Sequence, residues 1–248
     1  MSKVEDYRKK LRMLDSWDSY LLAESRLPGP RANLELAFAV AMEGSEDQLV
    51  KYAELGPEEA ERDTKEEFLA VCGVVGLGYL AERGISGHFD LIRKRAGDPR
   101  WRIREAVALG MQKFGETSFD DLLVLMIDWS QGSLLERRAV VATLCEPTLL
   151  RDAHHAARIV DLLDEITSSI INEVNRRSDD FRVLRKALGY GWSVAVAAHP
   201  ESGKPRMEIW IQTLDGDIRW IMKNNLKKNR LVKMDSEWVE AQIQALSS

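Results

Sequence analysis

The chain has 248 residues, of which 45% are hydrophobic and 30% charged, and its formal net charge is −5. Because the net charge is negative, overall charge by itself argues against a general nucleic-acid-binding protein. The longest apolar run, around residues 68–80, is interrupted by three glycines, so the sequence predicts no membrane-spanning segment.

The N-terminal residues and the cysteines indicate a cytoplasmic protein. The first ten residues carry charges with no apolar core behind them, which is unlike a secretion signal. Cys72 and Cys145 each lie in apolar helical sequence with no second cysteine nearby. We therefore expect two buried thiols in a reducing compartment, and neither a disulfide nor a thiolate metal site.

Apolar residues recur at helical spacing along the chain, which predicts an all-α protein. A Pro- and Gly-rich break at residues 27–30 ends the first predicted helix. Asp98 and Pro99 predict another helix start, with the aspartate as N-cap and the proline at the first helical position. The segment 207–214 also reads as a short strand, but the helical series needs a helix there. The predicted helices span residues 4–23, 31–42, 46–55, 65–81, 89–96, 99–114, 120–129, 133–144, 148–176, 180–198, 204–214, 217–228 and 236–246.

Arginine-bearing helix starts recur along the chain at nearly constant spacing. Aligned on Arg104, Arg137, Arg185 and Arg219, they are separated by 33, 48 and 34 residues. Two of these gaps match the period of a helical repeat, and the longer one fits a repeat with an insertion of roughly fifteen residues. We therefore predict an α-solenoid, or superhelix, of about six antiparallel helix pairs.

Such an array reads as a single domain over residues 1–248, with capping helices at 1–27 and 235–248. Within it, an arginine at each helix start can reach an acidic partner in the adjoining repeat. A purely structural ladder is therefore one interpretation of the four arginines.

Charge is unevenly distributed along the chain. Residues 31–66 contain four basic and ten acidic side chains, whereas residues 176–233 contain thirteen basic and six acidic ones. A second basic cluster comprises Arg93, Lys94, Arg95, Arg100, Arg102 and Arg104. Basic residues at equivalent repeat positions would line one concave surface, which suits a phosphate backbone. The basic end of residues 217–230 is the best candidate for contact with a polyanion. Lys223, Lys227 and Lys228 fit equally well as solvated cations that stabilise the dipole near a helix end.

Several segments together resemble a known family, the DNA alkylation repair glycosylases built on HEAT-like repeats. These segments are Asp98-Pro99-Arg100-Trp101-Arg102-Ile103-Arg104-Glu105-Ala106, Glu136-Arg137-Arg138-Ala139 and Val183-Leu184-Arg185-Lys186-Ala187-Leu188-Gly189-Tyr190. The resemblance implies that aromatic residues hold a damaged nucleotide while a carboxylate assists glycosidic cleavage and an arginine clamps a phosphate. On this sequence the aromatics are Trp101 and Tyr190, the catalytic carboxylate is Glu105 and the clamp is Arg138. Tyr190 stands where the family has tryptophan, and Glu105 where it usually has aspartate.

Three functions remain open from the sequence. The leading one is non-enzymatic binding of nucleic acid, such as duplex DNA, on a basic concave face. The second is excision of alkylated bases by a DNA glycosylase, and the third is a protein scaffold that docks partners on the acidic region 31–66. The residues expected at a nucleic-acid interface are Trp101, Arg102, Arg104, Arg137, Arg138, Arg185, Lys186, Tyr190 and Arg219.

No cofactor and no metal are expected. His154 and His155 are adjacent, so on a helix they point about 100° apart and cannot ligate one metal as an i, i+4 pair does. Gly189 and Gly191 lack the strand and the further glycine of a dinucleotide-binding loop. We expect both glycines to pack against the long helix predicted at 148–176.

Overall fold

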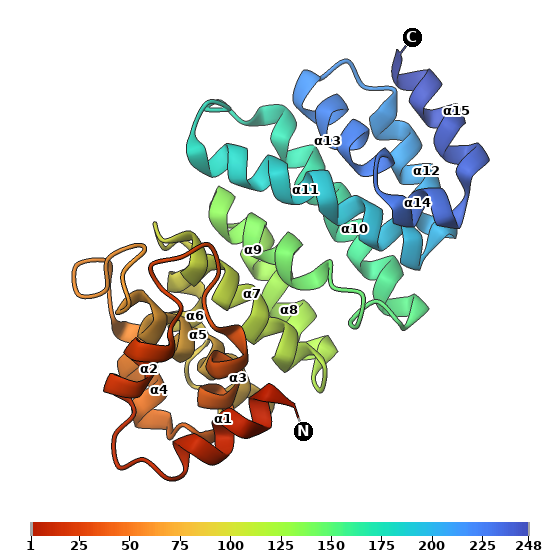
Figure 1. Ribbon diagram of the computed structural model, residues 1–248. Coiled ribbons are helices and arrows are strands. Elements are labelled where there is room, and N and C mark those ends of the chain that lie inside the picture. The colour runs from red at the N-terminus through yellow and green to blue at the C-terminus, as the bar shows by residue number, and fades with distance from the viewer. Residues whose placement is uncertain (1, 248) are drawn as a thin grey trace. The chain divides into compact units, whose positions relative to one another are not determined.

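The computed structural model describes residues 2–247 and contains helices and turns, with no strand in that range (Figure 1). The all-α prediction is confirmed. The chain divides into two compact units, residues 1–122 and 123–248. A stack of repeats also divides in this way, because each repeat contacts only its neighbours, so the single-domain prediction stays a prediction. Residues 1 and 248, the outermost positions of the two predicted capping segments, lie outside the described range.

The helices follow one another along the chain with short connections. Those up to residue 130 are α1 (Lys3–Leu11), α2 (Asp18–Glu24), α3 (Leu34–Glu43), α4 (Glu46–Glu54), α5 (Glu67–Glu82), α6 (Phe89–Ala96), α7 (Trp101–Gly115) and α8 (Phe119–Ser130). The remainder are α9 (Leu134–Leu144), α10 (Ala153–Ser169), a 3-10 turn (Ile170–Asn172), α11 (Asp179–Ala198), α12 (Pro200–Ile211), α13 (Gly216–Leu226), α14 (Asn229–Met234) and α15 (Ser236–Ser247).

Several predicted helix boundaries are wrong, for local reasons. The helix predicted at 4–23 is two helices, because α1 ends where the Trp17 indole Nε1 donates to the Leu11 carbonyl at 3.0 Å. α7 begins at Trp101 and not at Pro99, since the Asp98 carboxylate binds the backbone and guanidinium of Arg100 instead of capping the helix.

Further along the chain, the long helix predicted at 148–176 shrinks to α10, which begins after Asp152 caps it. The short helix α14 has no predicted counterpart. The sequence therefore identified most helices and misplaced several ends.

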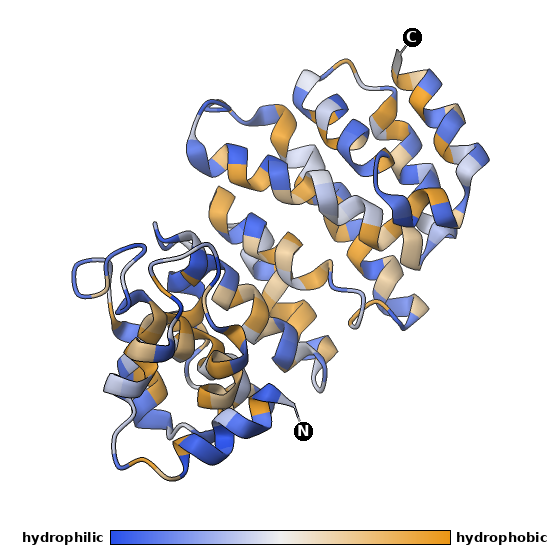
Figure 2. Cartoon of the chain, viewed as in Figure 1, coloured by the Kyte–Doolittle hydropathy of each residue, from blue (hydrophilic) through white to orange (hydrophobic). Residues whose placement is uncertain are grey.

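The first unit is organised around α5. This helix contacts α2, α3, α4, α6 and α7, and nearly all of its residues are buried (Figure 1). A helix surrounded on all sides is expected to be apolar all round, which explains why charged residues of α5 are confined to its two ends, Glu67 and Glu82. In Figure 2 the outer helix α1 is largely hydrophilic, whereas the helices around α5 carry hydrophobic residues.

Glycines let α5 approach its neighbours closely on two sides. A Cβ on Gly73 would lie 2.1 Å from the Ala53 nitrogen of α4, and one on Gly78 would lie 2.1 Å from the Gly110 oxygen of α7. Neither site has room for a side chain, because both obstructing atoms belong to the backbone. The interrupted apolar run of the sequence is therefore a close-packed core helix.

The second unit is organised around α11, which contacts α9, α10, α12, α13 and α14. Trp192 is fully buried, and its Nε1 donates to Thr167 Oγ1 at 2.9 Å. Asn225 of α13 is also fully buried, and its amide donates to the Leu188 carbonyl at 2.8 Å and accepts from the Ser193 N–H at 2.8 Å. These polar pairs fix how α10 and α13 pack on α11.

The glycines of α11 do not pack as expected. Gly191 faces Val141 of α9 and Cys145 just after that helix, and Gly189 faces the Trp220 ring of α13. The expected neighbour, α10, is instead met by Trp192. Gly189 thus makes room for an aromatic ring, which matters for the surface described below.

Among the described residues, no helix is both long and apolar enough to cross a bilayer. Cys72 and Cys145 are free and buried, as predicted. Burial raises the pKa of both thiols, that of Cys145 to about 12.

Candidate nucleic-acid interface

The arginines at the start of α7 bind groups of the protein itself. Arg102 is only 5% exposed and donates to Asp63 at 2.5 Å, to Glu67 at 3.0 Å and to the Gly29 carbonyl at 2.6 Å. The bond from Arg102 holds the pKa of the Asp63 carboxyl below its usual value. Arg104 donates to the Asp98 carbonyl at 2.6 Å. This geometry favours the structural interpretation for both arginines.

A second pair of arginines closes the end of α4. Arg95 donates to the carbonyls of Ala53 at 2.8 Å and Glu54 at 2.7 Å. Arg100 is 1% exposed and binds the Asp98 carboxylate at 2.8 and 2.7 Å. Its other donors reach the carbonyls of Leu55, Gly56 and Ala60. Much of the basic cluster around residues 93–104 is therefore internal.

In the second unit, three of the predicted arginines are also engaged or buried. Arg137 donates to Ser169 Oγ at 3.2 Å, and Arg138 is 8% exposed. Arg219 donates to the carbonyls of Thr213 at 3.4 Å and of Leu246. Arg219 therefore ties α13 to the end of α15.

Trp101 and Glu105 line one cavity of about 590 Å³ in the first unit. They lie one turn apart on α7, so their side chains leave the helix on the same side. The opposite wall is the segment 26–35, which contributes the exposed Arg31 and the ion pair of Arg26 with Glu35 at 3.4 Å. The volume of this cavity is within the usual range for small-ligand sites. Its lining combines apolar side chains, such as Val71 and Leu109, with the charged Arg31 and Glu105.

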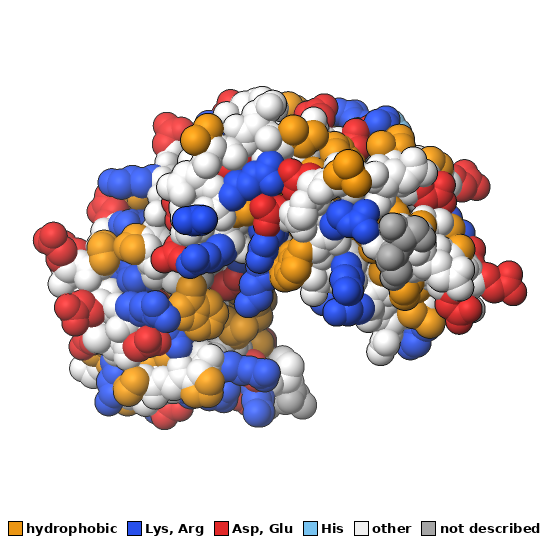
Figure 3. Space-filling model, turned by 90° about the horizontal axis from the view of Figure 1, so that it is seen from above, with side chains coloured by type: hydrophobic (Ala, Val, Ile, Leu, Met, Phe, Trp, Pro, Cys, Tyr) orange, Lys and Arg blue, Asp and Glu red, His pale blue; other side chains and the backbone are white. Residues whose placement is uncertain are grey.

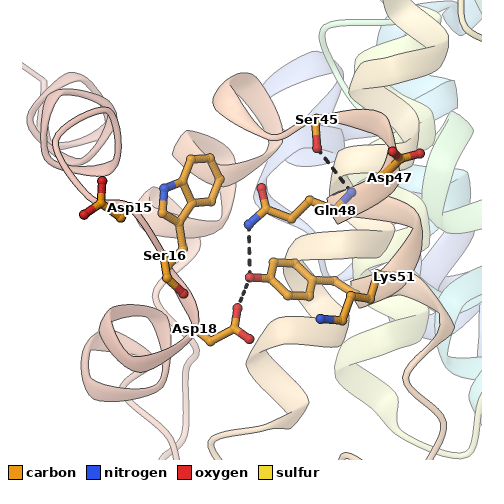
Figure 4. Close-up of a pocket in the computed structure, with 9 residues that line it drawn as sticks. Asp15, Ser16, Asp18, Ser45, Asp47, Gln48 and Lys51 are labelled. Carbon is orange, nitrogen blue, oxygen red and sulfur yellow. Dashed lines mark hydrogen bonds between the residues drawn. The ribbon is translucent and has the colours of Figure 1, made fainter.

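A second, polar hollow of about 550 Å³ lies between the α1–α2 connection and the start of α4 (Figure 4). The Tyr52 hydroxyl donates to the Asp18 carboxylate and accepts from the Gln48 amide at 3.2 Å. Burial, followed by the bond to Asp18, raises the pKa of Tyr52. The polar groups at the centre of this hollow thus satisfy one another.

Two packed helices of the second unit present a surface that we call the basic aromatic face. Helical spacing places its members on one side of α11 and on the adjoining side of α13. Figure 3 shows Lys and Arg side chains beside exposed hydrophobic ones on the side of the molecule that it presents. The face comprises Arg182, Arg185, Lys186 and Tyr190 of α11, Trp220 and Lys223 of α13, and the following Lys227, Lys228 and Arg230.

Trp220 is one of the two aromatic residues of the basic aromatic face and is 36% exposed. The guanidinium carbon of Arg185 lies 4.3 Å from its ring centroid, a cation–π contact. Arg185 is itself held by an ion pair with Asp217, which also accepts from Arg176 at 3.2 Å. The ring is thus fixed from beneath while part of it stays open to solvent.

Tyr190 is 43% exposed and is surrounded by cations. Arg230 donates to its hydroxyl at 2.6 Å, and the guanidinium carbon lies 4.6 Å from the ring centroid. The ammonium of Lys228 lies 5.7 Å from the same centroid. Both cations remain available to an anion, because neither pairs with a carboxylate of the described residues.

Three lysines complete the basic aromatic face. Lys186, Lys223 and Lys227 are exposed and form no ion pair within residues 2–247. By contrast, Arg182 pairs with Asp179 at 2.8 Å. Arg182 and Arg185 are thus compensated, whereas the lysines and Arg230 leave a local positive charge on this surface although the whole chain is acidic.

Sequence reasoning identified Arg185, Lys186 and Tyr190 and singled out the basic end of residues 217–230, but it did not place Trp220, Lys228 and Arg230 on one surface with Tyr190. Their sequence segment was recognised as basic, yet its relation to Tyr190 depends on how α13 packs on α11. Gly189 was the available signal, because a glycine inside a helix often marks the close approach of a neighbouring group.

No group of three or more His, Cys, Asp or Glu side chains within the described range is arranged to hold a metal ion. Comparison with known proteins found no matching family model, curated protein or solved structure. The case for function therefore rests on the geometry of the surfaces described above.

Proposed function

We propose that this protein binds nucleic acid through the basic aromatic face of its second unit. One observation carries the proposal: a pair of packed helices presents unpaired cations together with two exposed aromatic rings, Trp220 and Tyr190. Phosphate groups would bind the lysines and release their condensed counterions, which is the main source of sequence-independent affinity. The interaction needs no basic total, because charges beyond about 8 Å are largely screened at physiological salt.

The HEAT-like solenoid of about six helix pairs and the cytoplasmic location accompany this proposal as predictions. So does the non-enzymatic character of the binding. In this proposal the arginines expected at the interface have two different roles. Arg185 acts by holding Trp220, whereas Arg102, Arg104, Arg137, Arg138 and Arg219 serve mainly to hold the helices together.

The test is binding of a labelled oligonucleotide by fluorescence anisotropy, comparing wild type with a Lys223→Gln/Lys227→Gln variant. If each lysine makes one phosphate contact, the double variant binds about 25-fold more weakly at 0.1 M salt. The matched control is Lys10→Gln/Lys65→Gln, which removes the same charge from exposed positions of the first unit. Equal loss in both variants, or loss in neither, would contradict the proposal. Absence of any binding at low salt would leave the protein-scaffold hypothesis, with the acidic region 31–66 as docking surface.

A second candidate function is excision of alkylated bases. The observation in its favour is that Trp101 and Glu105 share the wall of one base-sized cavity. Trp101 would contact a cationic base by a cation–π interaction, and Glu105 would stabilise positive charge on the sugar.

The enzymatic hypothesis is tested by measuring release of methylated purines from DNA. It predicts that wild type releases the bases at a measurable rate. In Glu105→Gln the rate should fall roughly a hundredfold or more, which is the effect expected when a group that stabilises charge in the transition state is removed. Glu58→Gln, at an exposed position outside the cavity, is the control. No release by wild type would refute the hypothesis and leave nucleic-acid binding untouched.

A further inference from the structure

We propose that the basic aromatic face selects unpaired nucleotides, whose bases stack on Trp220 and Tyr190. This inference rests on the proposed function, since it specifies the kind of nucleic acid that the same face takes. The prediction from sequence was duplex DNA, and the structure supplies the reason to change it.

The first step concerns the exposure of the two rings. Trp129 and Trp192 are buried to within 1% of their surface, whereas Trp220 and Tyr190 stay 36% and 43% exposed. Both exposed rings lie among cations, so they do not form an apolar patch of the kind that another protein would cover. Aromatic rings interleaved with cations are typical of surfaces that bind single strands.

The second step concerns how the rings are held. A Cβ on Gly189 would lie 3.0 Å from Cζ3 of Trp220, so the ring edge rests on the backbone of α11 immediately before Tyr190. Arg185 covers the ring at 4.3 Å, and Arg230 holds the hydroxyl of Tyr190 at 2.6 Å. The Trp220 and Tyr190 rings are therefore held in place before any ligand binds, which reduces the conformational entropy lost on binding.

The third step concerns what each nucleic acid can offer. In a duplex the bases are stacked on one another and leave only their edges and phosphates exposed. An unpaired base exposes a flat π surface that stacks on an aromatic ring or on a guanidinium plane. Phosphates of either form can reach Lys223 and Lys227, but only unpaired bases can use Trp220. The rings therefore add affinity for single strands alone.

The experiment compares single- and double-stranded oligonucleotides of equal length for wild type, Trp220→Leu and Lys223→Gln/Lys227→Gln. Leucine keeps apolar bulk against Gly189 and removes the π surface. Trp220→Leu is expected to weaken single-strand binding roughly 5- to 150-fold and duplex binding less than about twofold. The lysine variant is expected to weaken both forms. Trp220→Phe is expected to recover most of the single-strand affinity.

The possible outcomes separate this inference from the proposed function. If wild type binds neither form, both are overturned. If it binds but Trp220→Leu changes single-strand and duplex affinity alike, or changes neither, stacking is refuted while phosphate binding stands. Tyr190→Leu provides an independent variant on α11, and the same selective loss is expected, so a folding defect in one variant does not decide the result.

Discussion

Arg100 provides a quantitative test of the claim that the helix-start arginines of the first unit are structural. Its side chain is 1% exposed and makes two bonds to the Asp98 carboxylate, at 2.8 and 2.7 Å. Three more bonds reach the carbonyls of Leu55, Gly56 and Ala60 at 2.9, 3.2 and 2.8 Å. One side chain thus joins the start of α7 to the chain that follows α4.

The perturbation is Arg100→Met, which keeps much of the volume and removes the charge and all donors. Asp98 is itself buried and would retain from side chains only the longer contact to Arg95 at 3.4 Å. Removing one partner of a buried ion pair typically costs about 3–5 kcal/mol. We therefore expect the free energy of unfolding to fall by about 4 kcal/mol, since the orphaned carbonyls can partly rehydrate.

The assay is urea unfolding followed by circular dichroism. With an m value of about 2 kcal/mol/M, the expected loss lowers the urea midpoint by about 2 M. The control is Lys94→Met on α6, an exposed residue, with an expected change within about 0.5 kcal/mol. If Arg100→Met lowers the free energy of unfolding by less than about 1 kcal/mol and also weakens nucleic-acid binding, the structural role of Arg100 is refuted. Arg100 would then be a residue that contacts the ligand.

Three further predictions concern packing, acid stability and thiol reactivity. Gly78→Ala should destabilise the protein by several kcal/mol in urea unfolding, because a Cβ would lie 2.1 Å from a backbone oxygen, whereas Gly87→Ala has open space and should be nearly neutral. The hydrogen bond from Arg12 lowers the pKa of Glu43 to about 2, so its contribution to stability is present above the unfolded-state pKa near 4.5 and is lost as the pH falls toward 2. Unfolding measured from pH 6 to 2.5 should show this loss, and Glu43→Gln should flatten it; an unchanged profile would contradict the assignment. Since burial raises the pKa of Cys145 to about 12, a thiol reagent at pH 8 should label it only after unfolding, and rapid labelling of native protein would argue against a buried thiol.

The sequence predicted the helical class because hydrophobic periodicity is a local property. It also located helices whose ends are marked by nearby residues. Ser133 and Glu136 form the reciprocal capping box that starts α9, one residue from the predicted start. The hydrophobic pattern did not predict a helix end that depends on a side chain outside the helix, as at the end of α1, where the Trp17 indole donates to the Leu11 carbonyl.

For the candidate site, even more depends on contacts between residues that are far apart in the sequence. Basic segments were visible in the sequence, but their roles depend on partners far along the chain. Arg100 binds carbonyls 40 to 45 residues away, so it was counted among the cations of a phosphate-binding cluster. Trp220 meets α11 at Gly189, a contact that no local spacing reveals.

The most direct test of the central claim is the salt dependence of oligonucleotide binding. Five cations of the basic aromatic face, at positions 186, 223, 227, 228 and 230, pair with no carboxylate of the described chain. At about 0.7 counterions released per phosphate contact on a single strand, full engagement gives a log–log slope of about −3.5. The account predicts that slope for wild type and for Lys10→Gln/Lys65→Gln, and about −2.1 for Lys223→Gln/Lys227→Gln. A wild-type slope near zero, or one unchanged in the Lys223/Lys227 variant, would contradict it.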